Sequence, residues 1–175
     1  AQGDDLDGPQ LLEFSHPGIT SVPKSQPTDF IHLHPRPIPN QFVVSVADIV
    51  PEGMYEVRLQ GHYGTTNSRP FHVTRLKEIQ GAPDNHTVTK SMSVAVNSIV
   101  SGQIDGQKTD YYKVNLKAGQ TVHVEVFAHR IDSRADATLS IRKSNGRILQ
   151  TSRNEYGNDP SLAFVAPQDG AYVIG

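Results

Sequence analysis

The sequence offers few side chains whose types and spacing could bind a metal or break a bond. It contains 8 histidines and no cysteine, so a zinc or copper site would need imidazole and carboxylate ligands. His32 and His34 are two residues apart, and alternate side chains of an extended segment face the same way. Pro35 follows directly, and no Glu or Cys nearby completes a metal site. His123 and Glu125 share this spacing, which is normal for the solvent face of a strand.

Catalytic patterns are equally weak. The sequence has no Gly-x-Ser-x-Gly nucleophile motif. Ser, His and Asp are so plentiful that no particular triad stands out. Asp132 and Asp136 could in principle form the carboxylate pair of a glycoside hydrolase, but they flank a loop with no sign of a pocket. We therefore predict that the chain is not an enzyme.

The elements that would position these residues are strands. Alternation of apolar and polar residues is common, as in Phe42, Val44 and Val46 against Val43 and Ser45. The runs 54–59 and 71–76 alternate in the same way, whereas no helical periodicity is sustained over three turns. Turn signals such as Asn145-Gly146 separate the runs. Regularly spaced short strands predict an all-β sandwich or barrel.

Two breaks in composition organise the chain. Five prolines lie between residues 23 and 40, which predicts loop or edge strand there because proline cannot donate to a sheet ladder. The turn-rich segment 80–86 follows a strand ending near Ile79. We place a domain boundary there and predict two tandem antiparallel β-sandwiches, residues 1–79 and residues 80–175. The chain ends directly after an apolar strand core, so we expect it to be a fragment of a longer protein.

Composition excludes several partners. The net charge is -2 and the Lys and Arg residues are scattered, so no nucleic-acid partner is expected. No window approaches the roughly 20 apolar residues of a membrane span. The start lacks the pattern of a secretory signal peptide, as a mature or recombinant form would.

The second half carries an ordered series of short motifs. They are Pro83-Asp84-Asn85, Ser101-Gly102-Gln103-Ile104, Asp110-Tyr111-Tyr112, Ala118-Gly119-Gln120, Asp136-Ala137-Thr138-Leu139, and Ala166-Pro167 leading to Tyr172. In this order they resemble the bacterial pre-peptidase C-terminal domain (PPC), a small jelly-roll-like β-sandwich appended to secreted proteins. The resemblance covers residues 80–175 and implies a domain that binds or supports something.

The first half resembles the later strands of an immunoglobulin-like domain of the transcription-factor type (IPT/TIG). The motifs are Gly3-Asp4-Asp5-Leu6-Asp7-Gly8, residues 51–59 and residues 67–73. The strands that precede the first motif in that family are missing, so we expect a partial domain. Such a pair of domains is similar to those in secreted or surface proteins of planctomycete-type bacteria.

The PPC resemblance implies one cofactor, calcium. Some domains of this type bind Ca²⁺ through the lead-in acids and the Asp before the aromatic pair, here Asp84, Asn85 and Asp110, with Asp105 nearby. Ca²⁺ prefers six to eight oxygen ligands. However, Ala82 and Gln107 stand where the family has carboxylates. The alternative is that Asp84 and Asn85 cap a turn while Asp110 begins a strand.

Two loop aromatics could contact a partner. Tyr63 and Tyr156 lie in segments rich in Gly and Asn, and exposed loop aromatics often anchor interfaces. The alternative is a loop folded back over its own sandwich edge.

We predict a non-catalytic extracellular, cell-surface or periplasmic module for binding, adhesion or spacing within a larger protein. Its partner would be an extracellular protein or polysaccharide, or another domain of the same chain. Two alternatives remain. The fragment could be an accessory part of a secreted hydrolase or redox enzyme whose catalytic domain lies elsewhere, or a self-assembling surface-layer component.

Overall fold

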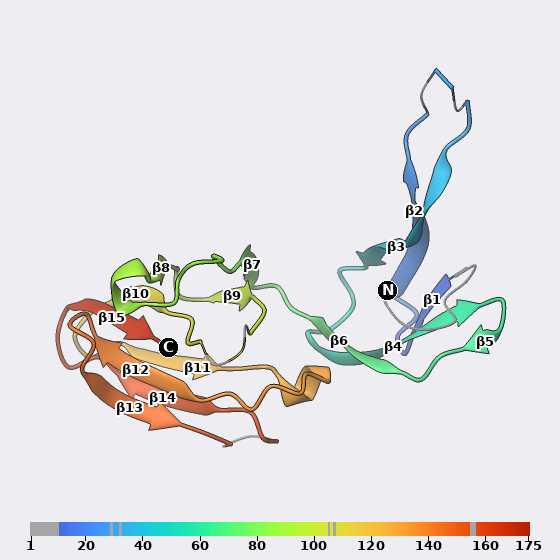
Figure 1. The fold of residues 1–175 in the computed structure, drawn as a ribbon. Helices are drawn as coiled ribbons and strands as arrows, with labels where there is room; N and C mark the ends of the chain where they lie inside the picture. The colour runs from blue at the N-terminus through green and yellow to red at the C-terminus, as the bar shows by residue number, and fades with distance from the viewer. Residues whose placement is uncertain (1–10, 29, 32, 105, 107, 155–156) are drawn as a thin grey trace. The chain divides into compact units, whose positions relative to one another are not determined.

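The computed structural model describes residues 11–28, 30–31, 33–104, 106, 108–154 and 157–175. The fold is all-β, as predicted, with strands joined by turns and by two single 3-10 turns, η1 (Val88–Lys90) and η2 (His129–Ile131). No helix of these residues is both long enough and apolar enough to span a bilayer. The chain divides into two compact units between Thr74 and Arg75, and each is described by itself (Figure 1).

The first unit contains two antiparallel groups of strands. In one group β4 is central, with β1 on one side and β5 and β6 also paired to it. The other group is the ladder of β2 and β3. The strands are β1 (Leu11–Phe14), β2 (Ile19–Gln26), β3 (Arg36–Val46), β4 (Gly53–Gly61), β5 (Gly64–Thr65) and β6 (Arg69–Val73).

The proline-rich segment forms the outer half of the β2–β3 ladder. Pro23 lies opposite Phe42, and Pro37 lies opposite Ser25, with a shift of register between them. The ladder projects as a two-stranded ribbon (Figure 1). Among the described strands, each of its two members pairs only with the other. This agrees with the prediction of edge strand, because an edge leaves room for residues that lack an N–H.

The core of the first unit is only partly covered. Its fully buried apolar side chains are Ile19, Val50 and Leu59. The other inward side chains line an open groove of about 460 Å³ and remain half-buried. The apolar ones are Leu12, Phe14, Phe42, Val44, Val57 and Phe71, and Lys24, Asn40 and Gln41 also line the groove. Phe14 and Phe71 pack edge to face, with ring centroids 5.0 Å apart.

The second unit is built from a five-stranded sheet in the order β13-β12-β15-β10-β8, with two further pairs, β11–β14 and β7–β9. Two of its pairings, β7–β9 and β10–β8, are parallel, which the prediction of antiparallel sheets did not include. The strands are β7 (Lys77–Gln80), β8 (Met92–Ser93), β9 (Ser98–Ser101), β10 (Tyr112–Leu116), β11 (Thr121–Glu125), β12 (Leu139–Lys143), β13 (Ile148–Ser152), β14 (Ser161–Val165) and β15 (Gly170–Ile174). The sequence analysis placed β7 in the first domain, but β7 pairs with β9 and lies in this unit.

Period-two burial holds along β10 and β14 of the second unit, where residues 114 and 116 and residues 162 and 164 are buried at alternate positions. They form one cluster with Leu139, Ile141, Ala166 and Tyr172. In β12 the intervening Ser140 is buried as well. The turn between β12 and β13 contains Asn145-Gly146, and Gly146 has φ +87°. This conformation suits glycine because it has no Cβ to clash, so the predicted hairpin is confirmed.

The contribution of each core to stability can be compared by replacing one leucine with alanine in each unit. We expect Leu139→Ala to lower the free energy of unfolding by about 2–5 kcal/mol, because Leu139 is only 3% exposed and its loss leaves a cavity. Leu12→Ala should cost clearly less, since the Leu12 side chain lines an open groove. Urea denaturation followed by circular dichroism measures both values. Equal losses would contradict the open core of the first unit.

Candidate functional site

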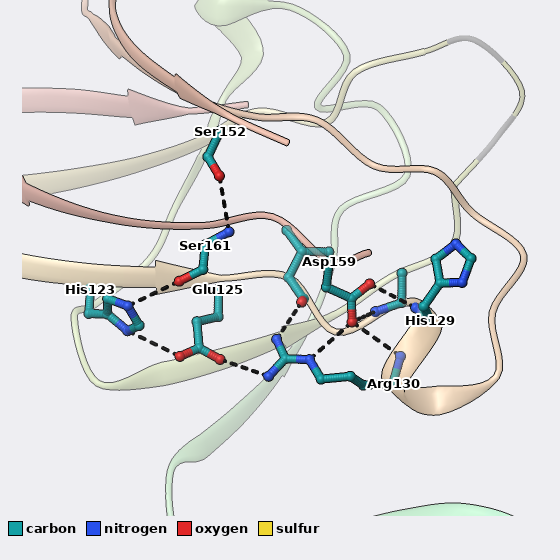
Figure 2. A network of polar contacts seen from close by, with 9 residues as sticks. His123, Glu125, His129, Arg130, Ser152, Asp159 and Ser161 are labelled. Carbon is teal, nitrogen blue, oxygen red and sulfur yellow. Dashed lines mark hydrogen bonds and ion pairs between the residues drawn. The ribbon is translucent and has the colours of Figure 1, made fainter. Parts of the chain in front are cut away.

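The densest polar network of the second unit centres on Asp159, which is 0% exposed. Its carboxylate accepts backbone N–H groups from Ala128 (3.1 Å), His129 (2.8 Å) and Arg130 (3.1 Å). It also accepts the Nε–H of Arg130 at 3.1 Å. Figure 2 shows these donors converging on one side chain from the turn η2. Asp159 therefore fastens a loop to a turn about 30 residues away in sequence.

Both the backbone N–H groups at the start of η2 and the buried Asp159 carboxylate need these hydrogen bonds. The first N–H groups of a helical turn have no intrahelical acceptor, and a carboxylate from elsewhere can satisfy them. Burial raises the pKa of the Asp159 carboxyl, but the hydrogen bonds from His129, Arg130 and Ala128 outweigh burial. The net result is a pKa below the ordinary 3.8, and Asp159 is ionised at neutral pH.

Arg130 extends the network to the neighbouring strand. Its Nη1 donates to Glu125 Oε2 at 3.1 Å, and its Nη2 donates to the carbonyl of Val126 at 2.9 Å. The guanidinium carbon also lies 3.9 Å from the centre of the Phe127 ring, a cation–π distance. Every side of the guanidinium thus contacts the protein itself, which indicates a structural role.

Ser161, His123 and Glu125 form a chain that has the connectivity of a catalytic triad. Ser161 Oγ lies 3.0 Å from His123 Nε2, and His123 Nδ1 lies 3.2 Å from Glu125 Oε1 (Figure 2). The setting differs from that of a nucleophile. The His123 side chain is 58% exposed, and the backbone N–H of Ser161 already donates to Ser152 Oγ. The arrangement is a hydrogen-bond chain on the surface across β11 and β14.

The structure brings together part of the predicted calcium set. Asn85 is fully buried, its Nδ2 donates to the carbonyl of Tyr111 at 3.2 Å, and its own carbonyl accepts the Tyr111 N–H at 2.8 Å. Its Oδ1 is buried without a hydrogen-bond partner in the described part of the chain. Asp110 is held close by, with Oδ1 2.8 Å from His86 Nδ1. An orphaned buried oxygen beside a carboxylate suits a hard cation.

Tyr112 joins this cluster. Burial raises the pKa of its hydroxyl, a hydrogen bond with Asn85 works in the opposite direction, and the nearby Asp110 carboxylate raises the pKa further. Asp84 instead lies on the surface beside Lys90, at 3.7 Å. Within the described ranges, no three His, Asp or Glu residues are grouped closely enough to hold a metal ion. Asp105 lies outside those ranges, so the calcium set remains a prediction.

The remaining predicted site residues are dispersed. Tyr63 is 75% exposed in the turn between β4 and β5 and packs edge to face with His62. Its role as a partner contact remains a prediction. His34 is exposed on the proline-rich segment. Tyr156 and His32 lie outside the described residues.

Sequence reasoning missed Asp159 and Arg130. The only available signal was Asp159-Pro160, since an Asp before Pro favours a turn in which the side chain bonds to the backbone. That signal identifies a turn but not the distant N–H groups that meet the carboxylate.

The Asp159 anchor predicts a pH-dependent stability. Because the folded pKa lies below the unfolded value, its contribution is fully present above about pH 4 and is lost as the pH falls through the folded pKa. Asp159→Asn should lower the free energy of unfolding at pH 7 by about 3 kcal/mol, since the new amide N–H groups would face other donors and Arg130 would lose its buried carboxylate partner. Denaturation at pH 7 and at pH 3.5 should also show that acid lowers the free energy of unfolding less in the variant than in the natural chain.

Asp169→Asn is the matched control. Asp169 also accepts a backbone N–H, from Ala118 at 2.8 Å, but its side chain is 63% exposed. Its replacement should cost clearly less than that of Asp159, because solvent screens an exposed carboxylate. Equal losses in the two variants would show that Asp159 is not a buried anchor.

Comparison with known proteins places one part of the chain in a family. Residues 108–175 match the family model of the bacterial pre-peptidase C-terminal domain, a span that runs from just before Asp110 through β15. A search of the curated proteins found no match to the chain. Neither result identifies the first unit or a group of organisms. Residues 108–175 are therefore similar to the bacterial pre-peptidase C-terminal domain, a family of non-catalytic accessory domains typical of secreted bacterial proteins.

Proposed function

We propose that this chain is an extracellular binding and adhesion module of a larger secreted or surface protein. The second unit supplies a rigid accessory domain, and the first, which we propose to be a partial immunoglobulin-like domain, supplies the contact. The partner would be an extracellular protein. The observation that carries this proposal is the tip of the β2–β3 ribbon.

The ribbon tip presents three large apolar side chains to solvent. Phe30 is 92% exposed, Leu33 is 77% exposed and Ile31 is 68% exposed. They fall within four residues of the connection between the end of β2 at Gln26 and the start of β3 at Arg36, whereas exposed apolar residues on most proteins are scattered singly. Burying one such side chain contributes roughly 1.5–3 kcal/mol. A contact that covers all three would therefore make a substantial share of a binding energy.

The chemistry of the tip favours a protein over a polysaccharide. Sugar rings stack on flat aromatic faces, and the tip carries one aromatic ring beside two aliphatic side chains. The chain has no tryptophan. Aliphatic and aromatic side chains together are the anchors that fill apolar pockets of protein partners.

The alternative function is an accessory role for an enzyme whose catalytic domain lies outside these residues. It is compatible with the same rigid second unit, because Asp159 and Arg130 serve the domain itself. It predicts no loss of partner binding when the ribbon tip changes. An origin in planctomycete-type bacteria remains part of the proposal, and the longer reading frame would test it.

The ribbon tip can be tested by a double substitution, Phe30→Ser with Leu33→Ser. The wild-type chain, immobilised, is exposed to the secreted and surface proteins of the bacterium that encodes it, and retained proteins are quantified by mass spectrometry. We expect the double variant to retain at least about tenfold less of the specific partner, because two buried side chains are lost.

Val22→Ser is the control. Val22 is 59% exposed on the same ribbon, away from the tip. It should leave retention unchanged. Equal retention by the wild-type chain and the double variant would overturn the proposal.

We also propose that the Asn85–Asp110 cluster binds calcium, supported by the buried Oδ1 of Asn85 that has no partner among the described residues. Millimolar Ca²⁺ should then raise the midpoint of thermal unfolding by several degrees, because a ligand that binds the folded state stabilises it. Asp110→Asn should abolish that rise.

Asp136→Asn provides the comparison, since Asp136 is an exposed acid of the same unit paired with Arg153. It should keep the full response to calcium. A wild-type midpoint that does not move with Ca²⁺ would exclude the site while leaving the adhesion proposal intact.

A further inference from the structure

The inner part of β3 has an edge that no described strand occupies. β3 pairs with β2 along one side, and the topology gives it no other neighbour among the described residues. An unoccupied edge presents a row of backbone N–H and C=O groups to any chain that can pair with it.

The hydrogen bonds at the base of the ribbon show which residues face that edge. The Ala47 N–H donates to the carbonyl of Gly18 at 2.9 Å, so Ala47 points toward β2. Ile19, opposite Val46, donates its N–H to His16 in the turn and not across the ladder. Since backbone groups alternate between the two sides of a strand, Phe42, Val44 and Val46 direct theirs to the unoccupied edge.

Pro23 agrees with this alternation. It lies opposite Phe42, at a position where the ladder requires no N–H from β2. The lack of a donor therefore costs the β2–β3 ladder nothing.

The inner part of β3 lacks the residues that usually block pairing with another strand. Residues 42–46 read Phe-Val-Val-Ser-Val, with no charge, no proline and no glycine. Natural edge strands usually carry such residues to prevent pairing. The outer part of β3 has that protection, with Pro37 and Pro39 and with a left-handed residue at Asn40 (φ +58°). The contrast within one strand marks the inner segment as the part able to pair.

We infer that this edge is an interface between two copies of the chain, with β3 pairing antiparallel to β3 of the second copy around a two-fold axis at Val44. In this register Val44 faces its own counterpart, and Phe42 faces Val46 of the second copy. The outward backbone groups of all three residues are then satisfied. Two ribbons become one four-stranded sheet, and a two-fold contact of this kind closes without leaving a further edge of β3.

The side chains support the same register. Phe42 and Val44 line the half-covered groove of the first unit, so pairing sets the apolar residues of the two copies side by side on one face. Direct cross-strand apolar pairs stabilise sheets. The contact therefore extends an apolar surface that is incomplete in a single copy.

Charge does not oppose the contact. The charged residue of β3 is Arg36, eight residues from Val44, which corresponds to about 27 Å along a strand. The two Arg36 side chains would lie at opposite ends of the paired sheet, separated by several times the screening length of about 8 Å. The tip of each ribbon stays free, so this interface is independent of the proposed adhesion contact.

A single cysteine tests the register directly, because the natural chain has none. In a hydrogen-bonded antiparallel pair the Cα atoms lie about 5.5 Å apart, within the range of a disulfide. We expect Val44→Cys in the full chain to form a covalent dimer under mild oxidation, seen on a non-reducing gel. Val22→Cys, on the outer strand, should cross-link at least about tenfold more slowly. Equal rates would overturn the proposed register.

The backbone is tested with Val44→Pro. This change removes an outward N–H and leaves the hydrogen bonds to β2 in place. Light scattering coupled to gel filtration should show a dimer of the natural chain that forms with increasing concentration, and a variant that stays monomeric with an unchanged circular dichroism spectrum.

A natural chain that is monomeric up to roughly 1 mM, where an association of only about -4 kcal/mol is visible, would overturn the interface. So would a folded Val44→Pro variant that still dimerises. The ribbon-tip double variant should dimerise like the natural chain, which separates failure of this inference from failure of the adhesion proposal.

Discussion

A pleated sheet is stable in water only when something covers its apolar face, and the two units of this chain meet that constraint to different extents. In the second unit the alternate residues of β10, β12 and β14 meet in one buried cluster with Tyr172. In the first unit the corresponding side chains surround an open groove. Among the described residues, the second unit therefore buries its apolar cluster, whereas the first leaves a half-covered face and one edge of β3 without a paired strand.

The polar interactions of the second unit follow from the same constraint. Covering a sheet requires loops, and loops carry backbone groups that need partners. Asp159 satisfies three such N–H groups at once and is neutralised by Arg130. The hydrogen-bonding capacity of Asp159 is thus directed at the protein's own backbone and at Arg130, whereas the Ser161–His123–Glu125 chain lies on the sheet surface.

Local patterns were enough to predict most of the architecture. Alternation identified 42–46, 54–59 and 71–73 as strand residues, which lie in β3, β4 and β6, and Asn145-Gly146 identified a hairpin, because both signals depend on neighbouring residues only. The parallel pairing of β8 with β10 depends on which strands meet in space, and alternation is the same for either direction. The role of Asp159 could not be predicted for a similar reason, because the N–H groups that it accepts lie 29 to 31 residues away in the sequence. The calcium set was also predicted from local motifs; in the structure Asp84 is exposed beside Lys90 and Asn85 is buried.

The ribbon of β2 and β3 has a mechanical consequence. Both of its strands are rooted in the first unit and run to the same tip (Figure 1). A tensile load applied at that tip is shared by two covalent backbones in parallel. The hydrogen bonds between them lie across the direction of pull, so they are not opened one after another as in peeling. Stiff prolines in the outer half leave little slack to be drawn out before the load reaches the base.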